Sequence, residues 1–531
     1  MTAIPPVGVR PPCPPALTTR ASRLTRLLNS LHPSPETLLL ILSLLIGGVT
    51  GAGVVTFHYL IHLIHALMVE DFMGLVARGN PWALACIPAL GGVVIGIMRW
   101  RFRDFGPNIS SLIAASQGLQ ELSPLKPIAK MVAASVSLGT GASLGPEAPS
   151  VEIGANFGML LAQVLKLSQE RQRLLLGAGA AAGLAAGFNA PIAGVFFALE
   201  VVLGSTFATS SVSVVLLAAV ISALIAQICL GSQPAFALPA YEVRSSLELP
   251  LYIGLGLLAS CVSLAYTEAI QLAERCFQGK VPGFAWLAKV PRPIHPFIGG
   301  VCVGLVALQL PQVLGVGYET VEAMLQDVKF SLPLLLLLLG VKLAMTAVSL
   351  GSGLVGGIFA PAMFLGASLG SAYGIFLAMI PAINGNIAAP PAYAMVGMAA
   401  VLAGSARAPL TAILLMFELT RDYRIVLPLM AAVGLSVWLV EFVNRRSTHS
   451  LNLQQMGVDV TVNVPPPPIE PLQGLEKSLG DRIVTGILSC QVPSEEHFPE
   501  HNDSSETPML ALAKSHLSED ANPLPETKSA A

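Results

Sequence analysis

Long apolar stretches, separated by short polar or glycine-rich segments, make up most of this chain. No Asp, Glu, Lys or Arg lies between Glu36 and Glu70, and none lies between Lys342 and Arg407. A helix that crosses a bilayer needs about 20 apolar residues, so both windows are long enough to span one. The pattern therefore predicts an all-α polytopic membrane protein.

The individual apolar stretches predict where the helices lie. They cover residues 37–68, 81–98, 126–138, 149–166, 171–185, 191–204, 210–230, 249–275, 294–310, 332–349, 358–380, 392–405, 409–419 and 426–443. Several are too short to span a bilayer, and many are broken by Gly or Pro. Broken helices are tolerated in a membrane only where the freed backbone groups face protein or a water-filled cavity. We therefore expect irregular backbone inside the membrane region.

Composition supports the membrane class and adds little else. Of the 531 residues, 53% are hydrophobic and 11% are charged, against about 25% charged in ordinary globular proteins. The net charge of −2 says nothing about partners, and a nucleic acid is not expected among them. The seven cysteines are scattered without metal-ligand spacing, so they are interpreted as small packing residues.

No motif indicates a cofactor, a metal site or an enzyme active site. The chain has no Ser/His/Asp nucleophile arrangement, no H-E-x-x-H and no P-loop. His58, His62 and His65 share one helical face. No carboxylate or cysteine lies near them in the sequence, so a polar stripe is favoured over a metal site.

The two ends differ in composition from the membrane region, residues 37–455. The arm 1–36 is rich in proline and carries Arg10, Arg20, Arg23 and Arg26. By the positive-inside rule, this arm and the Arg445-Arg446 pair place both ends in the cytoplasm. An Arg-rich transit peptide is the alternative for the arm. The polar tail 456–531 is expected to be disordered. A plasma or inner membrane is the expected location, with a plastid membrane as the alternative.

Two motifs occur twice, in the same order, along the membrane region. The first, P-x4-G-x3-G, occurs as "PSVEIGANFG" and "PAMFLGASLG". The second occurs as "LAAGFNAPIAGVFFALE" and "LAGSARAPLTAILLMFE", which close on Glu200 and Glu418. Chance similarity in a Gly/Ala-rich chain is the alternative, but the shared order and nearly equal spacing favour a duplication, with halves of about 37–230 and 249–455. Repeated halves with interrupted segments predict a transport site at their interface.

Both copies of the first motif follow helix breakers. Gly145-Pro146 precedes one copy and Gly356-Gly357 precedes the other, and each copy opens with a proline suited to the first turn of a helix. Such a helix start leaves backbone N–H groups unpaired and carries about half a positive charge. Two starts brought together would bind an anion without Lys or Arg, and weakly enough to release it, as conduction requires.

Glu147 stands at the first of these helix starts, and its carboxylate is itself an anion. It can occupy the site when no other anion is there and swing away when protonated, so Glu147 is interpreted as a gate. The alternative is a structural carboxylate that caps the following helix, a role also open to Glu152 one turn later. A carboxylate in a membrane helix costs about 2.5–3.5 kcal/mol on insertion scales and usually has a function.

The motifs resemble those of the CLC family of chloride channels and proton/chloride antiporters, in a bacterial, cyanobacterial or plastid-like branch. "LGPEAPSVEIG" resembles the signature G-[KR]-E-G-P-x-V-x-I-G, and "GGIFAP", "FNAPIAGVFFALE" and "ARAPLTAILLMFELT" resemble the other three. The resemblance covers about residues 37–455 and implies two inverted halves with broken helices, a homodimer, and one anion path per subunit. It also implies that Glu147 is the external gate. The implied anion-binding residues are Gly145, Ala148, Ile358 and Phe359.

The chain departs from the family pattern at several positions to which the family gives a role. Ala148 replaces a glycine, Gly106 stands at the central serine, His449 at the central tyrosine, and Val201 at the internal glutamate of proton-coupled members. A histidine still donates a hydrogen bond, so Gly106 and His449 remain candidate anion ligands. Glu200, next to Val201, marks at most a weak proton pathway.

The sequence therefore predicts chloride transport gated by Glu147, with weak proton exchange and with the lipid bilayer as its surroundings. A purely passive voltage-gated chloride channel is the alternative. A cation-coupled solute transporter or an intramembrane enzyme is the interpretation from another class. The transporter would be expected to carry more acids along one path, and the enzyme a paired nucleophile and base.

Overall fold

The computed structural model describes residues 35–68, 82–102, 111, 125–204, 209–231, 248–326, 328, 330–381 and 387–444. Nearly all of the predicted arm 1–36 and the whole predicted tail 456–531 lie outside them. Within the described residues the regular structure is helical, apart from one β-bridge between Gly145 and Gly357. The predicted all-α class is confirmed.

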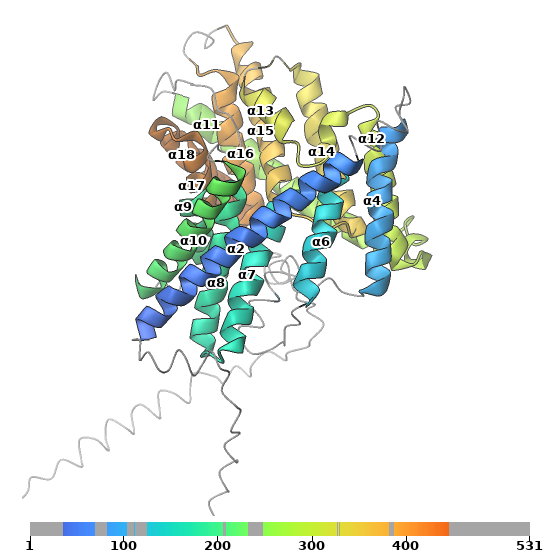
Figure 1. Ribbon diagram of the computed structural model, residues 1–531. Helices are drawn as coiled ribbons and strands as arrows, with labels where there is room; N and C mark the ends of the chain where they lie inside the picture. The colour runs from blue at the N-terminus through green and yellow to red at the C-terminus, as the bar shows by residue number, and fades with distance from the viewer. Residues whose placement is uncertain are drawn as a thin grey trace, which may run out of the picture. The chain divides into compact units, whose positions relative to one another are not determined.

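The helices drawn in Figure 1 have bounds that agree closely with the apolar stretches predicted from the sequence. Those of the first half are α2 (Pro35–His65), α4 (Trp82–Arg101), α6 (Leu125–Gly139), α7 (Glu147–Val164), α8 (Gln169–Phe188), α9 (Pro191–Phe197), the π-helical η2 (Ala198–Leu203) and α10 (Thr209–Leu230). Those of the second half are α11 (Leu249–Phe277), α12 (His295–Ala307), α13 (Tyr318–Leu325), α14 (Leu332–Ser352), α15 (Phe359–Ala378), α16 (Pro390–Ala406), α17 (Pro409–Thr420) and α18 (Val426–Asn444). Gly directly follows η2, α10 and α14, and Pro begins α9, α16 and α17.

Six helices in the described part of the chain are long and apolar enough to cross a membrane. They are Thr37–Met68, Val212–Leu230, Leu249–Phe277, Leu332–Ser352, Phe359–Ala378 and Tyr423–Asn444. Shorter apolar helices cover Pro191–Leu203, Arg292–Ala307, Pro390–Ala406 and Pro409–Thr420. The chain is a multi-pass membrane protein that combines long helices with shorter, interrupted ones, as predicted.

The helices of the two halves pack in the same way. In the first half α7 lies on α8, α8 on α10 and α10 on α2, and in the second half α15 lies on α16, α16 on α18 and α18 on α11. At the α7–α8 contact, a Cβ on Gly154 would collide with the carbonyl of Gly179. At the α15–α16 contact, one on Gly366 would collide with that of Gly397. The glycines shared by the two motif copies therefore let equivalent helix pairs approach closely.

The turn inside the second shared motif has the same backbone in both halves. Asn189 and Arg407 adopt left-handed φ angles of 57° and 55°. Ala190 and Ala408 follow with φ of −131° and −130°. An uncommon conformation repeated at equivalent positions is not expected from chance similarity of composition, so the predicted duplication is supported by the structure.

Among the described α-helices, α13 is the one that no predicted apolar stretch covers. It lies between the predicted stretches 294–310 and 332–349, and its sequence YETVEAML contains two glutamates. Only one face is buried, through Thr320, Val321, Met324 and Leu325. A search for membrane-spanning stretches overlooks a short amphipathic helix of this kind.

Candidate functional site

The two glycine-rich helix starts predicted to form an anion site lie directly against each other. Helix α7 begins at Glu147 and helix α15 begins at Phe359. The N–H of Gly145 donates to the carbonyl of Gly357 at 2.9 Å, and the N–H of Gly357 donates to the carbonyl of Gly145 at 2.7 Å. Neither N-cap residue makes a side-chain hydrogen bond into its helix. The positive ends of two helices, one from each half, therefore meet at what we call the junction.

Glu147 turns its carboxylate back into the junction. Its side chain is 1% exposed, and the carboxylate faces the backbone N–H of Ala360 in the first turn of α15. Oε2 lies beside Gly145, where an added Cβ would collide with it. In the described part of the chain Oε2 has no hydrogen-bond partner. The carboxylate thus lies where a free anion would meet both helix starts.

The other carboxylate oxygen is held by a residue that sequence reasoning missed. The Tyr318 hydroxyl donates a hydrogen bond to Glu147 Oε1. Tyr318 is the first residue of α13 and belongs to the second half, whereas Glu147 opens α7 in the first half. No sequence spacing links two residues so far apart, and α13 gave no apolar signal that would have drawn attention to Tyr318.

Ile358 and Phe359, the predicted anion ligands, are the N-cap and first residue of α15. Tyr266 of α11, a second residue that sequence reasoning missed, donates its hydroxyl to the Ile358 carbonyl at 3.1 Å. The Phe359 ring contacts the Phe197 ring at the end of α9, with the centroids 5.9 Å apart. These contacts anchor the start of α15 from two other helices. Anion binding by its N–H groups stays a prediction.

Ala148, which replaces a glycine of the family pattern, fits at the junction because Gly357 faces it. A Cβ on Gly357 would lie 2.9 Å from the Ala148 nitrogen and 3.0 Å from the Ala148 Cβ.

Glu152, one turn later, forms an ion pair with Lys130 of α6 at 2.7 Å. The ion pair gives the Glu152 carboxylate a structural role that links α7 to α6.

Residues 91–441 match the family model described as voltage gated chloride channel. The chain belongs to this family. The matched region contains both helix starts and both partners of the Tyr318–Glu147 hydrogen bond, so the family match and the junction concern the same part of the molecule. The CLC resemblance predicted from the motifs is confirmed.

Members of the CLC family from plants and bacteria are similar over most of this chain. The chain is 40% identical to chloride channel protein CLC-e of Arabidopsis thaliana over 449 residues, covering 78% of this chain and 61% of that protein. It is 29% identical to the H+/Cl− exchange transporter ClcA of Salmonella arizonae, covering 81% of this chain and 91% of that protein. The chain therefore spans about three fifths of the length of the plant relative.

Solved CLC structures share the fold. A structure described as a slow cyanobacterial Cl−/H+ antiporter has a TM-score of 0.69 at 24% identity and covers 80% of this chain and 98% of that one. A eukaryotic CLC transporter has a TM-score of 0.65 at 20% identity and covers 82% of this chain and 75% of that one. The predicted CLC-type fold is confirmed.

Glu200 and Glu418, which close the two copies of the second motif, each cap a helix of the other half of this CLC protein. Glu200 accepts hydrogen bonds from the N–H groups of Leu410 and Thr411 at 3.1 and 3.0 Å, and from the Thr411 hydroxyl at 2.7 Å. Glu418 accepts hydrogen bonds from two N–H groups in the first turn of α9, at 2.9 and 2.7 Å. Two backbone N–H groups at the start of α17 therefore bond a carboxylate from the first half, and two at the start of α9 bond a carboxylate from the second half.

This capping role bears on the predicted proton pathway. The donors bonded to Glu200 all belong to the first turn of α17, and Val201 beside it has no ionisable group. The proton roles of Glu200 and Val201 stay a prediction.

Among the described residues, no group of His, Cys, Asp and Glu is arranged to hold a metal. His58 Nδ1 lies 2.9 Å from the Val54 carbonyl of its own helix.

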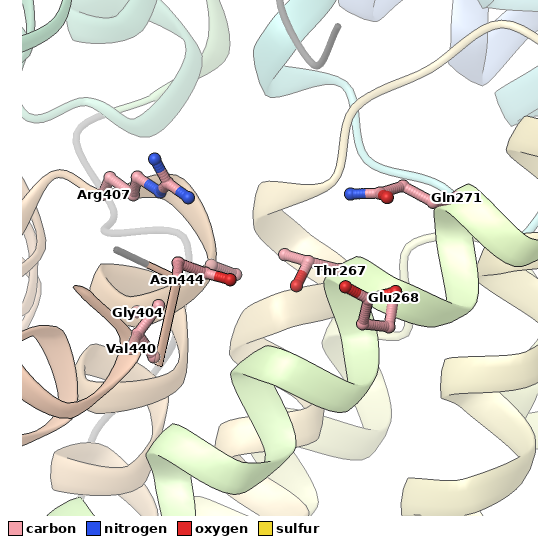
Figure 2. A pocket seen from close by; sticks show the side chains of 8 residues that line it. Thr267, Glu268, Gln271, Gly404, Arg407, Val440 and Asn444 are labelled. Atoms are coloured by element: carbon pink, nitrogen blue, oxygen red, sulfur yellow. The ribbon is translucent and has the colours of Figure 1, made fainter. Parts of the chain in front are cut away.

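A polar hollow of about 280 Å³, part of it open to solvent, lies between α11, α16 and α18. Its lining consists of Thr267, Glu268, Gln271, Gly404, Ser405, Arg407, Val440 and Asn444. In Figure 2, Thr267, Glu268 and Gln271 extend from one helix, and Arg407 and Asn444 lie across from them. Groups of both charge signs line the hollow, so it favours neither an anion nor a cation.

The predicted ligands Gly106 and His449 lie outside the described residues.

Proposed function

We propose that this protein carries chloride across a membrane and that Glu147 gates the path. The observation that carries the proposal is the position of the Glu147 carboxylate between two helix starts from two halves of the chain. A carboxylate and a chloride ion compete for the same partial positive charge. The path is therefore closed while the carboxylate lies in the junction and opens when it leaves.

The proposed anion ligands are backbone N–H groups at the junction. They belong to Gly145, Ala148, Ile358 and Phe359, and neither helix start, 145–149 or 356–361, contains Lys or Arg. Helix dipoles attract an anion without a full positive charge, and conduction requires binding that is favourable but weak. Gly106 and His449 are proposed as further ligands on the strength of the family pattern alone.

Weak proton exchange is proposed to accompany chloride movement. Glu147 can take up a proton when its carboxylate leaves the junction, which gives the outer end of a proton route. On the inner side Glu200 caps α17 and Val201 offers no carboxyl, so exchange is expected to be slow. The same absence of a carboxyl at Val201 favours the second candidate, a passive chloride channel.

Purified protein in liposomes, with chloride flux and internal pH followed together, tests the proposal. Chloride-loaded liposomes should discharge when valinomycin balances the charge, while protein-free liposomes should not. Movement of sodium instead of chloride would contradict an anion path. Proton uptake that accompanies chloride efflux supports exchange, and chloride efflux at constant internal pH supports the passive channel.

We also propose a homodimer with both termini in the cytoplasm, in a plasma, inner or plastid membrane. Membership of the CLC family supports the dimer, and the Arg-rich ends support the orientation. Mass photometry in detergent should give particles of two chains. A monomer that transports chloride would remove the dimer and leave the junction as the anion site.

A further inference from the structure

One hydroxyl from the second half of the chain holds the gate carboxylate of the first half. Tyr318 donates to Glu147 Oε1, whereas Glu147 Oε2 has no hydrogen bond with the described residues. We propose that the Tyr318 hydroxyl is a positioning group, which we call the latch, and that it keeps the Glu147 carboxylate where chloride would bind. This proposal rests on the proposed function. Opening the gate then requires the loss of the hydrogen bond from Tyr318.

The segment that carries Tyr318 is tied to the turn before Glu147. The segment begins at the 3₁₀ turn η6 (Pro311–Val313) and leads into α13 at Tyr318. Gly317, the N-cap of α13, has a left-handed φ of 84°. Within it, the N–H of Gly315 donates to the carbonyl of Gly141 at 2.9 Å. The hydroxyl and the carboxylate are therefore connected by a short backbone path, which holds them at hydrogen-bond distance.

Lys342 fixes the same segment from the side of α14. Its side chain is 0% exposed, and Nζ donates to the carbonyls of Val313 at 3.1 Å and Gly315 at 2.7 Å. Nζ also lies over the Phe364 ring of α15, 5.0 Å from the centroid. One buried amine thus joins the latch segment to α14 and to α15, the helix whose start forms half of the junction.

Such a latch sets the chloride concentration at which the gate opens. Chloride enters the junction only after the carboxylate leaves, so the apparent affinity is the intrinsic affinity multiplied by the open fraction. A hydrogen bond to a charged acceptor is strong enough to change that fraction about tenfold. The latch therefore weakens the apparent affinity for chloride without contacting the proposed chloride ligands.

Tyr318→Phe in the full-length protein, reconstituted in liposomes, tests the latch. Initial chloride flux is measured over a range of chloride concentrations, and correct folding is checked by size exclusion. The half-saturating chloride concentration should fall about tenfold, with maximal flux little changed. Tyr373→Phe is the matched control, because its hydroxyl donates to the Leu251 carbonyl at 3.0 Å, far along α15 from the junction. This control should keep the wild-type half-saturating concentration.

The same substitution in a Glu147→Ala background separates a latch from a direct chloride contact. Without the carboxylate, Tyr318→Phe should leave the half-saturating chloride concentration unchanged, because its partner is gone. A wild-type value in the single Tyr318→Phe protein, or an equal shift in both backgrounds, overturns the latch and leaves the proposed function standing. A folded wild-type protein that moves no chloride overturns the proposed function and the latch with it.

Discussion

Gly145 and Gly357 exchange two backbone hydrogen bonds, of 2.9 and 2.7 Å, and so join the two halves of the chain at the anion junction. The contact involves no side chain, and it needs none on either residue. A Cβ on Gly145 would collide with Glu147 Oε2, and one on Gly357 would lie 3.0 Å from the Ala148 Cβ. The geometry of the gate therefore depends on the smallest residue at both positions.

Gly357→Ala should destabilise the protein and reduce chloride flux. The added methyl must push Ala148 away from the junction, and overpacking of this kind costs about 1–3 kcal/mol. Thermal unfolding in detergent and flux in liposomes measure both effects. Gly340→Ala in α14 is the control, because no atom lies within 4 Å of its added Cβ. Equal unfolding temperatures for the two variants would contradict the packing described here.

Glu147→Gln should leave the anion path open and remove its pH dependence. Glutamine resembles the protonated carboxyl and carries no charge to hold in the junction, and it cannot transfer a proton. Chloride flux should therefore lose the pH dependence that the wild type shows between about pH 4 and 7. The wild type should respond to a proton gradient with chloride movement. If both proteins respond alike, Glu147 is a structural cap rather than a gate.

Glu200→Ala and Glu418→Ala should each lower stability by about 0.5–2 kcal/mol, the usual cost of losing a helix cap. Each change removes the acceptor for the first N–H groups of a helix in the other half. Glu170→Ala, an exposed residue of α8, serves as the control. Thermal unfolding measures the effect. A stable Glu200→Ala protein that loses proton exchange alone would make Glu200 a proton carrier instead.

Lys342→Met should destabilise the protein by about 1–3 kcal/mol, because the carbonyls of Val313 and Gly315 lose their donor. Methionine nearly keeps the volume of the side chain, so the effect reports the amine rather than packing. Lys289→Met, at an exposed position, is the control. An unfolding temperature equal to that of the wild type would show that the carbonyls of Val313 and Gly315 do not depend on this amine.

Deletion of residues 460–531 should leave chloride transport intact. None of the residues proposed for gating or anion binding lies in this region, and the family match ends at residue 441. Flux measurements on the shortened and the full-length protein, at equal protein per liposome, compare them directly. Loss of flux in a shortened protein that still elutes as a single folded species would give the tail a regulatory role.

The helices and the junction could be predicted because their signals are local. Apolar stretches and the Gly and Pro residues that interrupt them lie within single helices, and Gly145, Glu147 and Gly357 lie in motifs that the chain contains twice. A helix start exposes its N–H groups wherever the helix is placed. The chemistry of each helix start in the junction can therefore be predicted without its partner helix.

Tyr318, Tyr266 and Lys342 could not be predicted in the same way. Their roles come from contacts between segments that are distant in sequence, such as the Tyr318 hydroxyl on Glu147 and the Lys342 amine on two loop carbonyls. A lysine next to an apolar run has no local feature that reveals its acceptors. Glu200 is an intermediate case, because its motif is visible in the sequence but its hydrogen-bond partners in α17 are not.

The reciprocal caps of Glu200 and Glu418 affect how the chain is completed on the ribosome. Helix α9 is synthesised long before Glu418, yet two N–H groups of its first turn take their acceptor from that residue. Until residue 418 has been synthesised, these two N–H groups lack the acceptor that they have in the folded protein. The first half therefore completes the hydrogen bonds of α9 only together with the second half.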